Sequence, residues 1–231
     1  MLCTMILSSL SLLGLTSIAM ALAPPLTVQY QFPTAISDNM KVPVVLGVMS
    51  RCPDAILCES VFNRVLQRVG QKVEISLSFI AKPNASEPYG VTCMHGQAEC
   101  AGNVQELCAA KYHTTAEWWS FMQCQNFQGS DNIGTPETAL NCANAAGIDW
   151  ENGKAGRCAG KDGRGTEGIQ LLQQSARDSI AAGIQKSCTI IINGQQVCIR
   201  DGTWYDCEGG HSPGDFIRQI NEEYDRLNSA G

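Results

Sequence analysis

The chain has few charged residues and no cluster of basic ones. Charged side chains make up 16% of its 231 residues, and 22 Asp and Glu outnumber 16 Lys and Arg, for a net charge of −6. Proteins that bind nucleic acids or anionic membrane surfaces concentrate Lys and Arg on one face. We therefore expect no nucleic acid partner and no binding to an anionic membrane.

The signatures of several enzyme classes are also missing. The sequence has no Gly-rich phosphate-binding loop, no serine hydrolase motif and no spacing that suggests a catalytic carboxylate pair. Neither a cofactor nor a resident metal is expected.

Long apolar runs are absent after the N-terminus. Residues 1–23 carry no charge, are rich in Leu, Ile, Ser and Thr, and end in small residues that fit cleavage after Ala21 or Ala23. We expect a signal peptide at 1–23, a leader segment at 24–41 and a soluble domain at 42–231, with no membrane contact after cleavage. A retained membrane anchor is the alternative, because the usual N-terminal Lys or Arg is missing.

Cysteine, in contrast, is abundant. The chain has 12 cysteines, and removal of the signal would take Cys3 away and leave 11. So many cysteines in a secreted chain predict a disulfide framework, and an odd number leaves at least one thiol free, in exchange or paired between molecules. Asn84 begins a glycosylation sequon, Asn-Ala-Ser, which also fits the secretory route.

One stretch combines a strand, a cysteine and a helix. Val44–Met49 has the length and branching of a buried strand, and Cys52 follows it directly before Pro53, a residue suited to the first turn of a helix. Apolar residues then recur at helical spacing as far as Gly70. Cys52 should thus stand at a helix N-terminus, where backbone N–H groups and the helix dipole favour the reactive thiolate and lower a thiol's pKa.

The rest of the chain completes a recognisable order of elements. A second strand is predicted over 72–80, a Cys-rich helical insertion over about 82–164, and a helix over 166–182. A β-hairpin with an Asn-Gly turn follows over 189–199, and a final helix over 214–227. This order of β-α-β, insertion, helix, hairpin and helix predicts an α/β, thioredoxin-like fold with a disulfide-rich insertion.

A second cysteine motif lies in the insertion. It has the form Cys-x-His-Gly-x-x-Glu-Cys-x-x-Asn-x-x-x-x-Cys. Its fixed positions are Cys93, His95, Gly96, Glu99, Cys100, Asn103 and Cys108. The motif, the strand–Cys–helix unit and the hairpin resemble the gamma-interferon-inducible lysosomal thiol reductase family over about 42–227. The resemblance implies a soluble secretory or lysosomal enzyme that reduces protein disulfides at acidic pH through a Cys-x-x-Cys pair.

The chain departs from that pair. Ala55 stands where the second cysteine should be, and Cys58 is six residues from Cys52, about 9 Å along a helix, which is far for a disulfide. Thioredoxin-like proteins usually carry a cis-proline just before the hairpin, and here that position falls on Ser187-Cys188. We take Cys52 as the nucleophile and expect Cys188 to lie beside it as its resolving partner. Cys58 is the second candidate for that partner.

The motif residues admit more than one role. Cys93, Cys100 and Cys108 are better explained as structural disulfides than as catalytic thiols, and an oxidising compartment disfavours a metal held by Cys93, His95 and Cys100. His95 and Glu99 can act as acid and base, or His95 can simply hydrogen-bond within the insertion.

Two hypotheses from different classes follow. The first is a secreted or lysosomal thiol–disulfide oxidoreductase that acts on disulfide-containing proteins through Cys52. The second is a catalytically silent, thioredoxin-like secreted binding module with structural disulfides. A Cys52 that is permanently bridged and buried favours the second hypothesis, and an exposed Cys52 with a reversible partner favours the first.

Overall fold

The structure is a computed structural model, and it describes residues 39–229. The expected signal peptide, and all but the last residues of the leader, lie outside the described residues. Within 39–229, no helix is both long and apolar enough to cross a membrane.

The first half of the described chain forms a β-α-β unit followed by the insertion. Its elements are β1 (Val42–Val48), α1 (Pro53–Val69), η1 (Gly70–Lys72), β2 (Val73–Phe79), β3 (Lys82–Pro83), β4 (Val91–Thr92), α2 (Gln97–Tyr112), α3 (Thr115–Gln128), η2 (Ser130–Asn132), α4 (Pro136–Ala145) and α5 (Lys154–Ala159). The second half returns to the sheet. Its elements are α6 (Thr166–Ala181), β5 (Thr189–Ile192), β6 (Gln195–Asp201), β7 (Thr203–Tyr205) and α7 (Pro213–Asn228).

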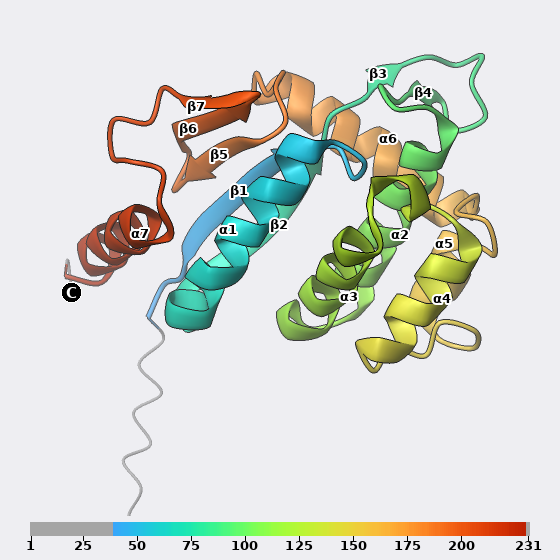
Figure 1. Ribbon diagram of the computed structural model, residues 1–231, viewed down its shortest axis with the longest axis horizontal. Coiled ribbons are helices and arrows are strands. Elements are labelled where there is room, and N and C mark those ends of the chain that lie inside the picture. Colours follow the sequence, from blue (N-terminus) through green and yellow to red (C-terminus); the bar gives the residue numbers. More distant parts are fainter. Residues whose placement is uncertain (1–38, 230–231) are drawn as a thin grey trace, which may run out of the picture. The chain divides into compact units, whose positions relative to one another are not determined.

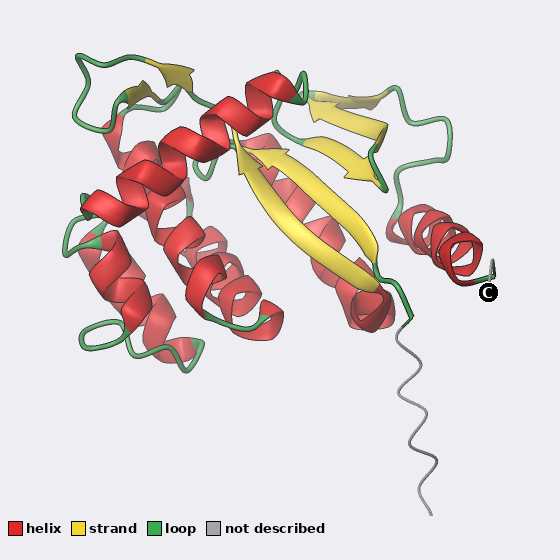
Figure 2. Ribbon diagram, turned by 180° about the vertical axis from the view of Figure 1, so that it is seen from behind, coloured by secondary structure: helices red, strands yellow, loops and turns green. Residues whose placement is uncertain are grey.

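Five strands form the central sheet, in the order β2-β1-β5-β6-β7. β1 and β2 are parallel, with Val44 opposite Ile75, as the predicted β-α-β unit requires. The hairpin strands β5 and β6 and the short β7 continue the sheet in antiparallel fashion (Figure 2). This mixed sheet with helices confirms the predicted thioredoxin-like α/β class.

Helices cover both faces of the sheet. α1 and α7 pack together on one face, where the rings of Phe62 and Phe216 lie 5.1 Å apart. α6 packs near β2 on the other face, where its Ser175 hydroxyl accepts a hydrogen bond from the Phe79 amide at 2.8 Å (Figure 1). The buried side of α1 comprises Ala55, Cys58, Glu59, Phe62, Val65 and Val69. All of these are apolar or small except Glu59.

The insertion is a group of four helices, α2 to α5, fastened by disulfides. Cys108–Cys158 joins α2 to α5, and Cys124–Cys142 joins α3 to α4. Thr135 is the N-cap of α4, since its hydroxyl accepts a hydrogen bond from the Thr138 amide. The insertion therefore has the helical, disulfide-rich character that its composition predicts.

Most predicted elements are confirmed, and the differences are local. The Asn-Gly hairpin turn has positive φ angles of 48° at Asn193 and 77° at Gly194, as a tight two-residue hairpin turn requires. The sequence patterns did not predict α5, the small β3–β4 pair or β7. These elements are short, and neighbouring segments of the chain hold them in place.

Candidate active site

Cys52 is the N-cap of α1, where the predicted strand and helix meet. Its amide donates to the Met49 carbonyl at 2.9 Å, and its own carbonyl accepts from the Ile56 amide at 3.1 Å. Pro53 occupies the first turn, as predicted. Cys52 is the one cysteine without a disulfide among residues 39–229, and only 7% of it is exposed. The odd cysteine count therefore corresponds to a free thiol at the start of a helix.

The insertion holds the turn that leads into Cys52. The Ser50 amide donates to Asn103 Oδ1 at 3.0 Å, and the Ser50 hydroxyl donates to the Glu99 carbonyl at 3.2 Å. Gly102 permits this approach, because a Cβ there would lie 2.6 Å from Ser50 Oγ. The position of Cys52 thus depends on α2, which begins 45 residues later in the sequence.

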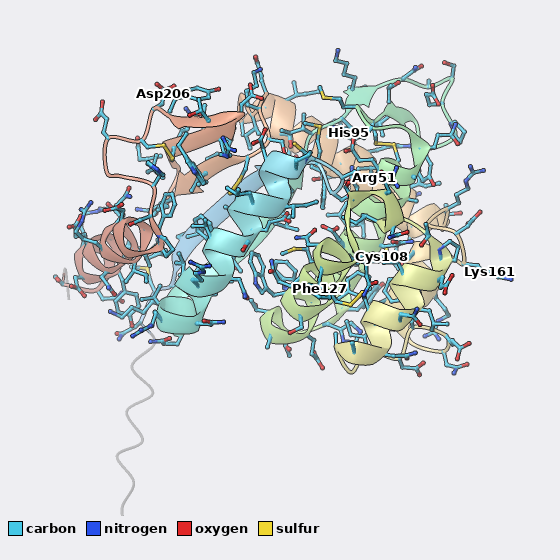
Figure 3. The ribbon with its side chains drawn as sticks, in the orientation of Figure 1. Arg51, His95, Cys108, Phe127, Lys161 and Asp206 are labelled. Carbon is cyan, nitrogen blue, oxygen red and sulfur yellow. A yellow bond between two sulfur atoms is a disulfide. The ribbon has the colours of Figure 1, made fainter. Side chains whose placement is uncertain are left out.

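Arg51 provides a second connection to the insertion. Its Nε donates to the Ser130 carbonyl at 2.7 Å, and its guanidinium also bonds the Asp131 carbonyl. Arg51 and His95 both lie beside the start of α1 (Figure 3). The residue before the thiol is therefore held by η2, and the residue after it by the first turn of α1.

The loop before β5 borders the other side of Cys52. Cys52 Sγ lies 3.9 Å from the Ser187 carbonyl oxygen, and the Ser187 hydroxyl accepts from the Met49 amide at 3.1 Å. The peptide bond between Ser187 and Cys188 is cis, at the position where thioredoxin-like proteins carry their cis-proline. The predicted proximity of this loop to Cys52 is confirmed at Ser187.

Cys188 itself is bonded to Cys58, so the expected pairing of Cys52 with Cys188 is wrong for this state of the protein. The Cα atoms of Cys58 and Cys188 are 6.3 Å apart, within the range of a disulfide, and both residues are fully buried. Cys58 lies on the inner side of α1, facing the sheet, and can therefore reach the residue that precedes β5. Cys52 and Cys58 are not bonded to each other, which agrees with their separation along the helix.

The family motif builds the N-terminal end of α2. Cys93 and Cys100 form a disulfide across a seven-residue separation, and Gly96 between them has φ of 83°, a conformation that favours glycine. The His95 ring bonds the Glu99 carboxylate, which is fully buried. The expected structural role of these cysteines is confirmed, and His95 forms a hydrogen bond within the insertion.

Asn103 connects this motif to the thiol. Its amide nitrogen lies 3.8 Å from Cys93 Sγ, and its oxygen accepts the Ser50 amide. From the sequence, Asn103 was only a motif position, Ser187 only part of the position of the usual cis-proline, and Ser50 had no predicted role. The fixed Asn within the motif was the only signal that could have indicated a contact with the Cys52 turn.

An ion pair lies on the sheet side of α1. Arg200 Nε is 3.3 Å from Asp54 Oδ1, and the Gly202 amide donates to Asp54 Oδ2 at 2.9 Å. The Arg200 guanidinium also lies 5.9 Å from the centre of the Trp204 ring. Asp54, a first-turn carboxylate, thus fixes the start of α1 against β6 and the turn that follows it.

Other predicted site residues lie apart from the thiol. Asn84 follows β3, and its side-chain nitrogen donates to Thr92 Oγ1 at 3.0 Å. Within the described part of the chain, no group of three or more His, Cys, Asp and Glu side chains is arranged to hold a metal ion. The sulfurs of Cys93 and Cys100 are already bonded to each other.

Several solved structures share this fold. BdbD from Bacillus subtilis superposes with a TM-score of 0.56 at 15% identity, covering 81% of this chain and 90% of that one. The thiol-disulfide exchange protein alpha-DsbA2 from Wolbachia pipientis gives 0.54 at 13% identity, covering 80% and 83%. MdbA, a thiol-disulfide oxidoreductase from Corynebacterium diphtheriae, gives 0.54 at 11%, covering 80% and 86%. At these identities the likeness establishes the fold.

Comparison by sequence finds one family that resembles part of the chain. No curated protein matches the chain. A family model described as gamma interferon inducible lysosomal thiol reductase (GILT) matches residues 43–146, which include β1, Cys52, α1 and the whole cysteine motif. Over this segment, a little under half of its length, the chain is similar to the gamma interferon inducible lysosomal thiol reductase family.

Proposed function

We propose that this protein is a thiol–disulfide oxidoreductase that reduces disulfides in proteins, with Cys52 as the nucleophile. The observation that carries the proposal is the free thiol of Cys52 at the N-cap of α1, beside the loop that holds Cys188. The thiolate is the attacking species in disulfide exchange, and a helix N-terminus is a favourable place for it. The match of residues 43–146 to a thiol reductase family supports the same chemistry.

Cys58 and Cys188 carry the electrons of the proposed cycle in their reduced, dithiol form, so the disulfide that joins them in the structure has to be opened first. A small thiol or dithiol first reduces it to two thiols, and is itself oxidised. Cys52 then attacks one sulfur of the substrate disulfide, and the other substrate sulfur leaves as a thiolate that takes up a proton. This step leaves Cys52 in a mixed disulfide with the substrate.

Resolution passes through Cys188 and ends in the state that the structure describes. The Cys188 thiolate attacks Cys52 Sγ, releases the second substrate thiol and forms Cys52–Cys188. The Cys58 thiolate then attacks Cys188 Sγ, which frees Cys52 and restores Cys58–Cys188. The substrate gains two electrons, and Cys58 and Cys188 lose them. In this cycle Cys188 and Cys58 together take the role of the second cysteine of a Cys-x-x-Cys pair, whose position Ala55 occupies here.

We place this activity in the secretory pathway, in the lysosome or outside the cell. Five disulfides within residues 39–229 suit an oxidising compartment, and the family description names the lysosome. The uncharged, apolar residues 1–23 fit a signal peptide, and Asn84 fits an N-glycosylation site. The substrates would be disulfide-containing proteins that reach that compartment.

A catalytically silent binding module is the second candidate. The observation that favours it is the burial of Cys52, of which 7% is exposed, next to a Cys58–Cys188 bond that already joins α1 to the loop before β5. In that case Cys52 would be a buried thiol without a reaction partner. The two candidates make opposite predictions for turnover.

Insulin reduction with a small thiol as the reductant distinguishes them. We expect turnover by the natural chain, loss of turnover in Cys52→Ser, and accumulation of the mixed disulfide in Cys188→Ser. The matched control is the double variant Cys124→Ser/Cys142→Ser, which removes a disulfide between α3 and α4 and should retain turnover. A correctly folded natural chain with no turnover at acidic or neutral pH would favour the binding module.

A further inference from the structure

Two carboxyl groups are buried between α1 and the insertion. Glu59 on α1 and Glu106 on α2 are each 1% exposed. Asn126 of α3 donates to Glu59 Oε2 at 2.6 Å, whereas Glu59 Oε1 and both oxygens of Glu106 have no hydrogen-bond partner. We call Glu59, Glu106, Gln125 and Asn126 the acid joint.

The acid joint has unpaired acceptors and lacks donors to match them. The side-chain oxygens of Gln125 and Asn126 are also buried without a donor. Their amide nitrogens are already used, on Gln105 Oε1 at 3.0 Å and on Glu59 Oε2. Two protons, one on each carboxyl, would turn two of these acceptors into donors. Buried polar groups are rarely left unpaired, so the arrangement fits the protonated form.

No cation neutralises the joint within the described chain. From α2, the nearby charged group is Glu99, whose carboxylate is bound by His95. Lys111 lines the same cavity as Glu106 but is paired with Glu167 at 2.7 Å. From α3, the side-chain amides of Gln125 and Asn126 belong to the joint, and Trp118 lines the cavity. The sheet and α6 contribute uncharged residues to that cavity, namely Ile75, Ser76, Leu77, Phe79 and Leu171.

The electrostatics agree with the hydrogen-bond count. Burial raises the pKa of Glu59 to about 8, and the hydrogen bond from Asn126 lowers it only in part. Burial, followed by repulsion from Glu59 and Glu99, holds the pKa of Glu106 well above its usual value of 4.5. Both carboxyls are therefore neutral at acidic pH.

We propose that Glu59 and Glu106 form a proton-dependent joint between α1 and the insertion, closed when both carboxyls carry a proton and weakened when they ionise. Ionisation places like charges inside the protein with no cation to offset them. The insertion is also the part that holds Ser50 and Arg51, the two residues before Cys52. Through this connection, and only if the proposed function holds, the joint adapts the position of Cys52 to an acidic compartment.

The stability consequence has a definite sign. An acid whose folded pKa lies above its unfolded pKa binds more protons in the folded state at intermediate pH. Its contribution is fully present below pH 4.5 and is lost as the pH rises toward about 8. The shift of the Glu59 pKa from 4.5 to about 8 alone corresponds to growth of the unfolding equilibrium constant by about 1,000-fold between acidic and mildly alkaline pH.

Urea unfolding of the disulfide-intact chain across this pH range tests the joint. We expect that Glu59→Gln and Glu106→Gln each remove a large part of the pH dependence, since an amide cannot ionise. Glu74→Gln, an exposed control on β2, should follow the natural chain. Variants that keep the full pH dependence would overturn the proposal.

Infrared spectroscopy of the natural chain tests it without any variant. A carboxylic acid C=O band should persist at neutral pH, where exposed carboxyls are ionised, and should disappear as the pH rises past about 8. The absence of such a band at neutral pH in the folded protein would overturn the proposal. Neither measurement requires turnover, so an inactive Cys52 would contradict the proposed function and leave the joint intact.

Discussion

The position of Cys52 is set by its neighbours in the sequence and by one distant residue, Asn103. The buried strand before it and Pro53 after it are local signals, and both were sufficient to predict the N-cap position. The bond between Ser50 and Asn103 spans 53 residues, and no local pattern indicates it. The disulfide partner of Cys188 was mispredicted because that choice depends on which side of α1 faces the sheet.

Asn103 offers a test at the scale of one residue. Asn103→Ala would leave the Ser50 amide buried without an acceptor, at a cost of about 1–3 kcal/mol in the free energy of unfolding. The turn before Cys52 should loosen as well, so alkylation of Cys52 should become faster. Urea unfolding and the rate of iodoacetamide labelling measure the two effects.

Asn144→Ala is the matched control for that variant. Asn144 is exposed on α4, and its side chain makes no hydrogen bond within the described structure. It should change neither quantity. If the Asn103→Ala protein is as stable and as slowly labelled as the Asn144→Ala protein, Asn103 does not hold the turn before Cys52.

At the scale of elements, the spacing of apolar residues and the residues of the turns predicted the main helices and strands. The alternation in β2, the amphipathic pattern of α6 and the Asn-Gly turn each carry their own signal. The short elements α5 and β7 carry little signal of their own, since they depend on packing against α2 and on pairing with β6. The parallel pairing of β1 and β2 was accessible because two strands joined by a helical crossover in one sheet run parallel.

Two disulfides of different loop length give a prediction at this scale. Cys58–Cys188 closes a sequence separation of 130, and Cys198–Cys207 closes one of 9. In the chain-entropy model, losing the first costs about 5 kcal/mol and losing the second about 3 kcal/mol. The double variant Cys58→Ser/Cys188→Ser should therefore unfold at a lower urea concentration than Cys198→Ser/Cys207→Ser. The reverse order would show that Cys58–Cys188 is not a principal structural cross-link.

For the whole molecule, the balance of carboxyl groups predicts a limited pH range of stability. Hydrogen bonds within the Thr114 and Ser212 capping boxes lower the pKa of Glu117 and of Asp215. Their contribution is present above the unfolded pKa and is lost as the pH falls through the folded pKa. The acid joint has the opposite sign, so its contribution decreases as the pH rises toward about 8.

Stability should therefore be greatest at mildly acidic pH and decrease on both sides. Urea midpoints measured from strongly acidic to alkaline pH check this expectation. Glu117→Gln should flatten only the acidic side, and Glu59→Gln only the alkaline side. A stability that rises steadily from acidic to alkaline pH would contradict the assignment of both groups.

The central claim is that Cys52 is the thiol that attacks a substrate disulfide, and mapping the mixed disulfide tests it most directly. The chain in its described state, with Cys58 and Cys188 bonded, is incubated with a disulfide-linked peptide, quenched with acid and mapped by mass spectrometry. We expect the peptide to be bound at Cys52, and we expect the Cys52→Ser protein to bind no peptide. A peptide bound at Cys58 or Cys188 instead, or no capture by a folded chain, would contradict it.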